Sequence, residues 1–322
     1  MSELTRREFI ASTVGATALA GTGIVAGDWL YATGSKTPTL NLGPPAGLTV
    51  DPLIKGPTDK VKLGKSGLTV SLVGVGTGSM GWAHQSNQTR LGQEKFTSLM
   101  RHALDSGINF FDLADQYGTN PYFSVALKGV PRDRYVIQTK STSRNAEDAR
   151  QDIDRFLNEL ATDHIDSLII HCVTEGDWTK RFRGVMDVFE EARQAGKIRA
   201  HGVTCHSFAA LQAAAASDWV QINQVRWNPR GAHMDAEVKT VQELFGKMRS
   251  KGQGMIGMKV VGQGDIVNGA RALTPEACFR FQIQSGVVDA FVVGVEKPEH
   301  IDQMLRGTQL ALNEFGYRVV AA

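Results

Sequence analysis

Short apolar segments alternate with longer amphipathic segments through most of this 322-residue chain. The short segments are rich in β-branched residues, which is typical of buried strands; they cover 71–76, 108–112, 135–140, 166–171, 198–204, 220–224, 254–260 and 290–295. Between them, apolar residues recur at helical spacing in 93–106, 146–160, 183–196, 208–217, 238–251 and 275–285. Gly107, Gly196 and Gly252 follow three of these amphipathic segments, as expected where a helix ends.

Eight strands that alternate with helices predict an α/β fold of the (β/α)8 TIM barrel type. An open doubly wound sheet is the competing architecture, and it usually carries a glycine-rich phosphate turn after its first strand. Gly74, Gly76 and Gly78 lie at the end of the first apolar segment, but their spacing departs from G-x-G-x-x-G. We therefore predict a barrel.

The segment before the barrel divides into two parts. Residues 1–30 combine Arg6-Arg7, in TRREFI, with a weakly apolar stretch and the small-residue triplet Ala18-Leu19-Ala20. This pattern resembles a twin-arginine signal peptide, which implies export of the folded protein by the twin-arginine machinery. We expect a periplasmic or otherwise exported protein, tethered to the membrane if the signal stays uncleaved. Residues 31–60 form a Pro/Gly-rich linker, either disordered or lying along the barrel, and we assign 61–306 to the barrel and 307–322 to a short tail.

Charge and cysteine content narrow the choice of partners. Lys and Arg total 35 against 33 Asp and Glu, without a basic stripe, so we expect no nucleic-acid partner. Cys172, Cys205 and Cys278 are far apart and odd in number, so their spacing predicts no disulfide framework. The absence of a C-x-x-C or His-rich cluster predicts no metal site.

Three consecutive predicted strands end on an ionisable side chain. Asp112, Lys140 and His171 close the second, third and fourth strands, and Tyr117 follows in the loop after Asp112. In a barrel these strand ends share one rim, which is where the active sites of such barrels lie. We expect the lysine cation to lower the pKa of the phenol, Asp112 to hold Lys140, and His171 to orient a carbonyl oxygen. The four could protonate that oxygen, but a cofactor must supply hydride.

The segment GINFFDLADQYG, Gly107 to Gly118, resembles the signature of the aldo-keto reductases. The run that begins at Lys62 is similar to the family's first barrel segment, and the run that ends at Glu299 is similar to its last one. The resemblance therefore extends from about residue 61 to 306. It implies a barrel that binds a nicotinamide cofactor without a Rossmann domain. It also implies that Asp112, Tyr117, Lys140 and His171 are catalytic, with Tyr117 as proton donor for a small-molecule carbonyl or alcohol substrate.

The resemblance carries over less cleanly to the cofactor-binding positions, which it places at Thr77, Thr204, Cys205, Gln224, Met258, Lys259, His300 and Gln303. Cys205 stands where the family usually has asparagine, and Met258 stands where an aromatic residue commonly stacks on nicotinamide. Lys259 could reach a phosphate. Glu296 would repel a 2′-phosphate, but Lys297 could compensate. We expect NADPH, with NADH as the alternative.

Two functions follow from these observations. The first is an NAD(P)-dependent oxidoreductase that transfers hydride between nicotinamide and an aldehyde or ketone, or the alcohol in reverse, and that needs a redox partner or its own turnover to recycle the nucleotide. The second is an exported barrel that has lost this chemistry and serves as a binding or assembly module, as the changes at Cys205 and Met258 suggest. Candidates for the substrate pocket are Trp82, His84, Trp178, His206 and Trp227.

Overall fold

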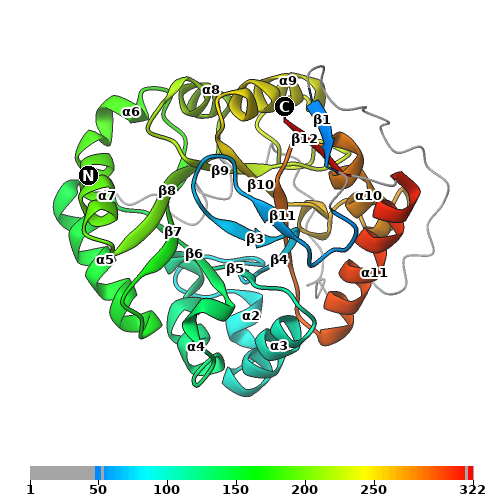
Figure 1. Ribbon diagram of the computed structural model, residues 1–322, viewed down its shortest axis with the longest axis horizontal. Helices are drawn as coiled ribbons and strands as arrows, with labels where there is room; N and C mark the ends of the chain where they lie inside the picture. The colour runs from blue at the N-terminus through cyan, green and yellow to red at the C-terminus, as the bar shows by residue number, and fades with distance from the viewer. Residues whose placement is uncertain (1–47, 52–53, 316–317, 322) are drawn as a thin grey trace.

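A closed parallel barrel forms the centre of the protein, as the sequence predicts. The computed structural model describes residues 48–51, 54–315 and 318–321, so the predicted signal segment and most of the linker lie outside it. Its barrel strands follow the order β10-β11-β4-β5-β6-β7-β8-β9 (Figure 1). Their bounds are β4 (Val73–Gly76), β5 (Phe110–Asp112), β6 (Val136–Ser141), β7 (Ile165–Val173), β8 (Ile198–Cys205), β9 (Ile222–Arg226), β10 (Gly254–Met258) and β11 (Ala290–Gly294).

Amphipathic helices surround the barrel (Figure 1). In α5, for example, Ala149, Ile153, Phe156 and Leu160 recur at helical spacing and are all buried. The longer helices are α3 (Gln93–Asp105), α4 (Thr119–Ala126), α5 (Ala146–Leu160), α7 (Arg183–Gln194), α8 (Phe208–Ala216), α9 (Val238–Ser250), α10 (Pro275–Ser285) and α11 (Pro298–Phe315). Shorter ones are α2 (Asn87–Arg90), α6 (Trp178–Arg181), η2 (Asp115–Tyr117), η3 (Arg132–Arg134) and η4 (Gly262–Gly264).

The sequence pattern did not predict α4 or α11. Pro121 lies in the first turn of α4, where proline is tolerated although it disguises the helix in a sequence. Gly307 lies inside α11, where a Cβ would come within 2.8 Å of the Phe279 ring of α10. The glycine therefore allows close packing of α11 on α10. Because α11 runs from Pro298 to Phe315, it crosses the boundary that we placed between barrel and tail at residue 306.

A hairpin covers the amino-terminal end of the barrel. Its strands β2 (Lys60–Lys62) and β3 (Thr69–Ser71) pair antiparallel, and Figure 1 shows them across the barrel centre. A Cβ on Gly64 in the turn would lie 2.5 Å from the backbone nitrogen of Gly254, the first residue of β10. The hairpin thus contacts the start of a barrel strand, which leaves the carboxyl ends of the strands for the site.

A second small sheet joins the two ends of the described chain. Strand β1 (Leu48–Asp51) pairs antiparallel with β12 (Arg318–Ala321), and β12 contacts α9 and α10. The sequence left open whether the linker is disordered or lies along the barrel. Residues 48–51 of this predicted linker form a strand.

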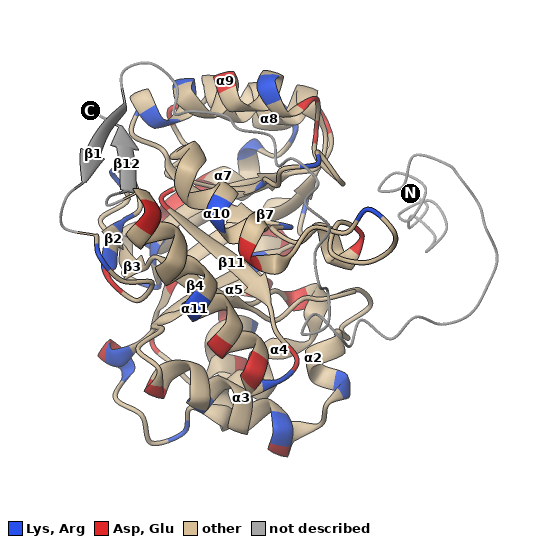
Figure 2. Cartoon of the chain, turned by 90° about the vertical axis from the view of Figure 1, so that its right-hand side faces the viewer, with Lys and Arg blue, Asp and Glu red and all other residues tan. Residues whose placement is uncertain are grey.

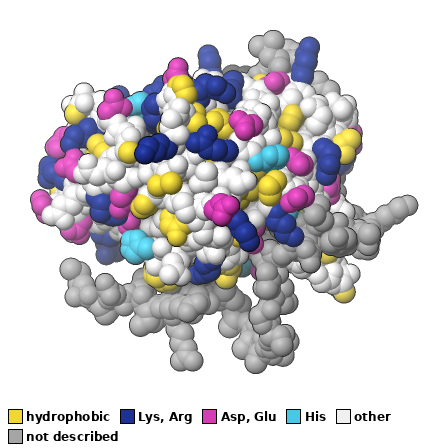
Figure 3. Space-filling model, turned by 90° about the horizontal axis from the view of Figure 1, so that it is seen from below, with side chains coloured by type: hydrophobic (Ala, Val, Ile, Leu, Met, Phe, Trp, Pro, Cys, Tyr) yellow, Lys and Arg dark blue, Asp and Glu magenta, His cyan; other side chains and the backbone are white. Residues whose placement is uncertain are grey.

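Charged residues of both signs are interspersed over the outer helices (Figure 2), and their side chains are interspersed over the face shown in Figure 3. No single-sign field dominates either view. In the part of the chain that the structure describes, no helix combines the length and apolar character needed to cross a membrane.

Candidate active site

Asp112, Lys140 and His171 meet at the carboxyl ends of β5, β6 and β7. The Lys140 Nζ donates to Asp112 Oδ1 at 2.6 Å and to the carbonyl of Leu113 at 2.7 Å. The Lys140 side chain has no exposed surface. A buried ammonium needs such partners, because desolvation disfavours the charged form.

Two glutamine side chains hold the Asp112 carboxylate in place. Gln224 Nε2 donates to Asp112 Oδ2 at 2.8 Å, and Gln138 Nε2 donates to Asp112 Oδ1 at 2.9 Å. Gln138 in turn accepts from Ser167 Oγ at 2.9 Å. Gln138 was not among the predicted site residues, although its position two residues before Lys140 places both side chains on one face of β6.

Tyr117 lies over this group at the end of the short helix η2. Its hydroxyl oxygen is 3.4 Å from His171 Nε2, and Lys140 Nζ is 4.8 Å from the centre of its ring. Gly78 and Gly81, in the loop after β4, leave room for the ring, because a Cβ at either position would lie within 2.4 Å of a ring carbon. The loop after β4 therefore fixes the orientation of the phenol.

Burial controls the protonation states of Tyr117 and His171. Burial, followed by the negative charge of Asp112, raises the pKa of Tyr117 well above its ordinary value. The expectation that Lys140 lowers this pKa is wrong, since burial and the charge of Asp112 raise it. Burial and the nearby cations Lys140 and Arg144 lower the pKa of His171 well below its ordinary value. At neutral pH the site holds a protonated phenol beside a neutral imidazole.

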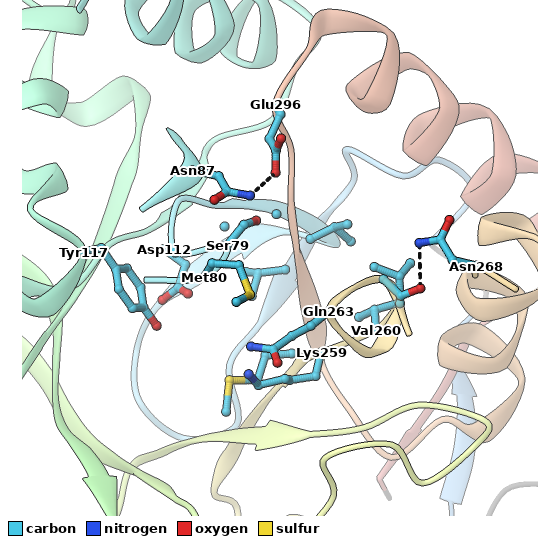
Figure 4. A pocket seen from close by; sticks show the side chains of 18 residues that line it. Ser79, Met80, Asn87, Asp112, Tyr117, Lys259, Val260, Gln263, Asn268 and Glu296 are labelled. Carbon is cyan, nitrogen blue, oxygen red and sulfur yellow. Dashed lines mark hydrogen bonds between the residues drawn. The ribbon is translucent and has the colours of Figure 1, made fainter. Parts of the chain in front are cut away.

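A cavity opens beside Tyr117 and Asp112. It encloses about 880 Å³ of empty space, including its open mouth. Figure 4 shows it extending from Tyr117 and Asp112, past Lys259, to Asn268 and Glu296. Glycines at the ends of β4 and β11, Gly76 and Gly294, form part of its wall. The cavity thus connects a proton donor to an elongated binding space.

Comparison with known proteins identifies the family. The model of the aldo/keto reductase family matches residues 72–270, more than half of the 322-residue chain. The chain belongs to the aldo/keto reductase family.

Named relatives within this family are distant. L-galactose dehydrogenase of Arabidopsis thaliana is 31% identical over 153 residues, covering 44% of this chain and 47% of that protein. The NADH-specific methylglyoxal reductase of Escherichia coli strain K12 is 25% identical over 166 residues, covering 44% of this chain and 51% of that protein. The matched stretch therefore spans about half the length of these curated relatives.

Solved structures show the same fold. A putative aldo-keto reductase from Pseudomonas aeruginosa has a TM-score of 0.66 at 21% identity, covering 80% of this chain and 98% of that one. The holo form of an aldo-keto reductase from Bacillus halodurans has a TM-score of 0.62 at 18% identity, covering 80% of this chain and 95% of that one. At these identities the likeness shows the barrel fold alone.

Among the cofactor positions implied by the family resemblance, Met258 and Lys259 line the cavity. Gln224 Oε1 and Thr204 Oγ1 are buried without a hydrogen-bond partner in the described chain. Thr77 Oγ1 instead donates to the Asp112 carbonyl at 2.9 Å, so it supports β5. These five positions surround the carboxyl end of the barrel.

Like Thr77, Thr204 and Gln224, the other three positions do not line the cavity. Cys205 is buried at the end of β8. His300 and Gln303 are buried in α11, where His300 Nδ1 accepts from the Glu296 backbone nitrogen at 3.2 Å and Gln303 Nε2 donates to Glu276 at 2.8 Å. His300 and Gln303 thus position the last loop, and neither lines the cavity.

The prediction that Trp178 and Trp227 line a substrate pocket is wrong. Both indoles are fully buried. Trp178 Nε1 donates to the Ala210 carbonyl at 3.1 Å, and Trp227 Nε1 donates to Ser285 Oγ at 2.9 Å. Indole rings with a satisfied N–H and no exposed surface serve the packing of helices on the barrel.

Proposed function

We propose that this family member is a nicotinamide-dependent oxidoreductase that interconverts an aldehyde or ketone with its alcohol. The observation that carries the proposal is the Tyr117 hydroxyl, held 3.4 Å from His171 Nε2 and next to the buried pair of Lys140 and Asp112. Tyr117 and Asp112 both line the cavity. This arrangement suits proton transfer to an oxygen atom that gains charge during the reaction.

Residues of the barrel strands near the cavity, together with Met258 in its wall, fit a nicotinamide nucleotide. Gln224 Oε1 and Thr204 Oγ1 are buried polar atoms without partners in the described chain, and a carboxamide offers both a donor and an acceptor. Met258 supplies an apolar surface at the same end. When bound there, the reduced nucleotide supplies the hydride that no side chain of the site can provide.

The four residues Asp112, Tyr117, Lys140 and His171, here called the tetrad, each have a distinct part in the proposed proton transfer. Tyr117 keeps its proton because burial raises its pKa, and it donates that proton when the substrate oxygen becomes negative. His171 is neutral, so its imidazole can hydrogen-bond the same oxygen without carrying charge. Lys140, held by Asp112 at 2.6 Å, provides the positive charge that stabilises the tyrosinate left behind.

Loss of reductase chemistry in favour of a binding or assembly role is the alternative. One assay separates the two: purified protein is mixed with NADH or NADPH and a panel of aldehydes, ketones and sugars, and nucleotide oxidation is followed at 340 nm. The proposed function predicts substrate-dependent oxidation. Tight nucleotide binding without turnover on any carbonyl, or with any alcohol in reverse, would support the binding module instead.

We further propose a preference for NADH, in place of the NADPH expected from the sequence. Asn87 Nδ2 donates to Glu296 Oε1 at 2.9 Å, and both residues line the far end of the cavity. A fixed carboxylate repels a 2′-phosphate but accepts hydrogen bonds from a ribose diol. The name of the NADH-specific methylglyoxal reductase of Escherichia coli is in line with this preference.

Export through the twin-arginine route is also proposed, on the pattern TRREFI around Arg6-Arg7. This route accepts folded cargo, so the barrel would close around its nucleotide before it leaves the cytoplasm. Cell fractionation tests the proposal: the wild type is expected in the periplasm with nucleotide bound, and Arg6→Lys/Arg7→Lys in the cytoplasm. An identical distribution of the two, or periplasmic protein without nucleotide, would contradict it.

A further inference from the structure

Three cations lie beside the tetrad, at the ends of neighbouring barrel strands. Arg144 follows β6, Arg226 ends β9, and Lys259 follows β10. Two of these charges act on His171, because Arg144 and Lys259 lower its pKa after burial and Lys140 do so. After burial, Arg226 lowers the pKa of the neighbouring His206. A concentration of like charges in a partly buried site requires compensation.

Two of the cations have their partners within the chain. Arg226 forms an ion pair with Asp235, and both side chains are buried. Arg144 Nη2 donates to the carbonyl oxygen of His171 at 2.7 Å, and Arg144 Nη1 donates to that of Thr142 at 2.9 Å. The guanidinium groups of both arginines therefore already have partners within the chain.

Lys259 differs from both. Within the described residues, its amino group forms no ion pair or hydrogen bond, and the charge of Asp265 acts on it only from beyond 4.0 Å. Its backbone has a φ of 56°, which is strained for a residue with a side chain. Burial, followed by the charge of Arg226, lowers its pKa to about 8. A strained cation without a counter-ion is unfavourable for folding, which points to a role in binding.

The position of Lys259 indicates which end of the cavity it serves. Lys259 lines the cavity together with Tyr117 and Asp112, and Figure 4 shows its side chain along the wall across from them. Its charge acts on His171 and His206, the imidazoles next to the Tyr117 hydroxyl and at the end of β8. The amino group thus belongs to the reacting end of the cavity, away from Asn268 and Glu296.

We propose that Lys259 binds a carboxylate on the carbonyl substrate, so that the preferred substrates are aldehyde or keto acids. This inference rests on the proposed oxidoreductase function and specifies its substrate class. One cation without a partner matches one negative charge, as a carboxylate carries. A charge-assisted hydrogen bond then compensates Lys259 only when substrate is bound, and it orients the carbonyl toward Tyr117.

Matched pairs of acid and ester test the proposal. The pairs are 4-carboxybenzaldehyde with methyl 4-formylbenzoate, and glyoxylate with ethyl glyoxylate. The carboxylate lies far from the aldehyde in the first acid and next to it in the second. The wild type is expected to show the higher kcat/KM for the acid in at least one pair. Lys259→Met should lower the acid-to-ester ratio of kcat/KM about 10- to 100-fold, and Lys259→Arg should restore most of it.

Lys239→Met is the matched control, because Lys239 is an exposed lysine on α9; its ratio should equal that of the wild type. Equal kcat/KM for acid and ester in the wild type would overturn the inference and leave the proposed function standing. A loss of nucleotide affinity in Lys259→Met as large as its loss of activity would assign Lys259 to a cofactor phosphate and also overturn it. Absence of turnover with every carbonyl compound would overturn both.

Discussion

Lys140 and Asp112 form an ion pair of 2.6 Å between nitrogen and oxygen, with 0% and 6% of their side chains exposed. Two further donors, from Gln138 and Gln224, reach the same carboxylate. A charge pair so enclosed contributes little net stability, but loss of one partner leaves the other charge buried and uncompensated. Substitution of either residue of the pair should therefore lower the stability of the barrel as well as change the site.

Replacement of Asp112 by asparagine should destabilise the protein by about 3–5 kcal/mol, because Lys140 then stays buried without a counter-charge. Denaturant unfolding measures this change. The double variant Asp112→Asn/Lys140→Met is expected to recover part of the loss, as coupled partners do in a double-mutant cycle. A single variant as stable as the wild type would show that Lys140 does not depend on Asp112 for its charge.

The packing of Tyr117 against glycine predicts a second effect. Gly78→Ala would place a Cβ 2.3 Å from the ring, so the ring must move, and a displacement of about 1 Å can reduce turnover about 100-fold. Steady-state kinetics and circular dichroism would show reduced kcat in a folded protein. Gly184→Ala, in α7 with the Ala146 methyl as the nearest atom at 3.3 Å, is the control. Equal kcat in both variants would contradict the proposed role of Gly78.

Lys259 should destabilise the folded protein at neutral pH. Its pKa of about 8 lies below the ordinary value of 10.5, so folding disfavours its charged form, and the stability lost through Lys259 grows as pH falls from 10.5 to 8. Lys259→Met removes this unfavourable charge near Arg226, Cys172, Asp265 and His206. We expect a gain of about 1–2 kcal/mol at pH 7, discounted for partial exposure, and about half of that or less at pH 9.5. A gain independent of pH would contradict the electrostatic explanation.

Glu296 predicts the cofactor preference. Glu296→Gln keeps a hydrogen-bonding partner for Asn87 but removes the negative charge near the far end of the cavity. The ratio of Kd for NADPH to Kd for NADH should therefore fall about 5- to 10-fold, since one charge interaction of about 1 kcal/mol is lost. Fluorescence titration with both nucleotides measures it. A wild type that binds NADPH at least tenfold more tightly than NADH would contradict the proposed preference.

The barrel was predictable because its signals are local. Strands of β-branched residues and helices of period 3.6 follow from the residues in each segment, and parallel strands place Asp112, Lys140 and His171 on one rim. The structure confirms the barrel and brings these side chains together. Gln138 was within reach of the same reasoning, because residues two apart share a face of a strand.

The remaining features depend on packing between distant segments. Burial of Tyr117 by the loop after β4 raises its pKa, and a sequence does not show how deeply a loop residue is buried. His300 and Gln303 lie on α11, a helix that the sequence pattern did not reveal, and face its packed side. Trp227 follows a strand end but turns toward Phe245 and Phe281. In each case a contact distant in sequence decides the role.

The central claim is that the Tyr117 hydroxyl delivers the proton during carbonyl reduction. Kinetics of Tyr117→Phe with a substrate that the wild type turns over, combined with titration of the nucleotide, tests it most directly. The account predicts that kcat falls at least 1,000-fold, in the range of general acid catalysis, while the nucleotide Kd stays within about twofold because the ring remains packed between Gly78 and Gly81. Retention of more than a tenth of wild-type kcat in this variant would contradict the account.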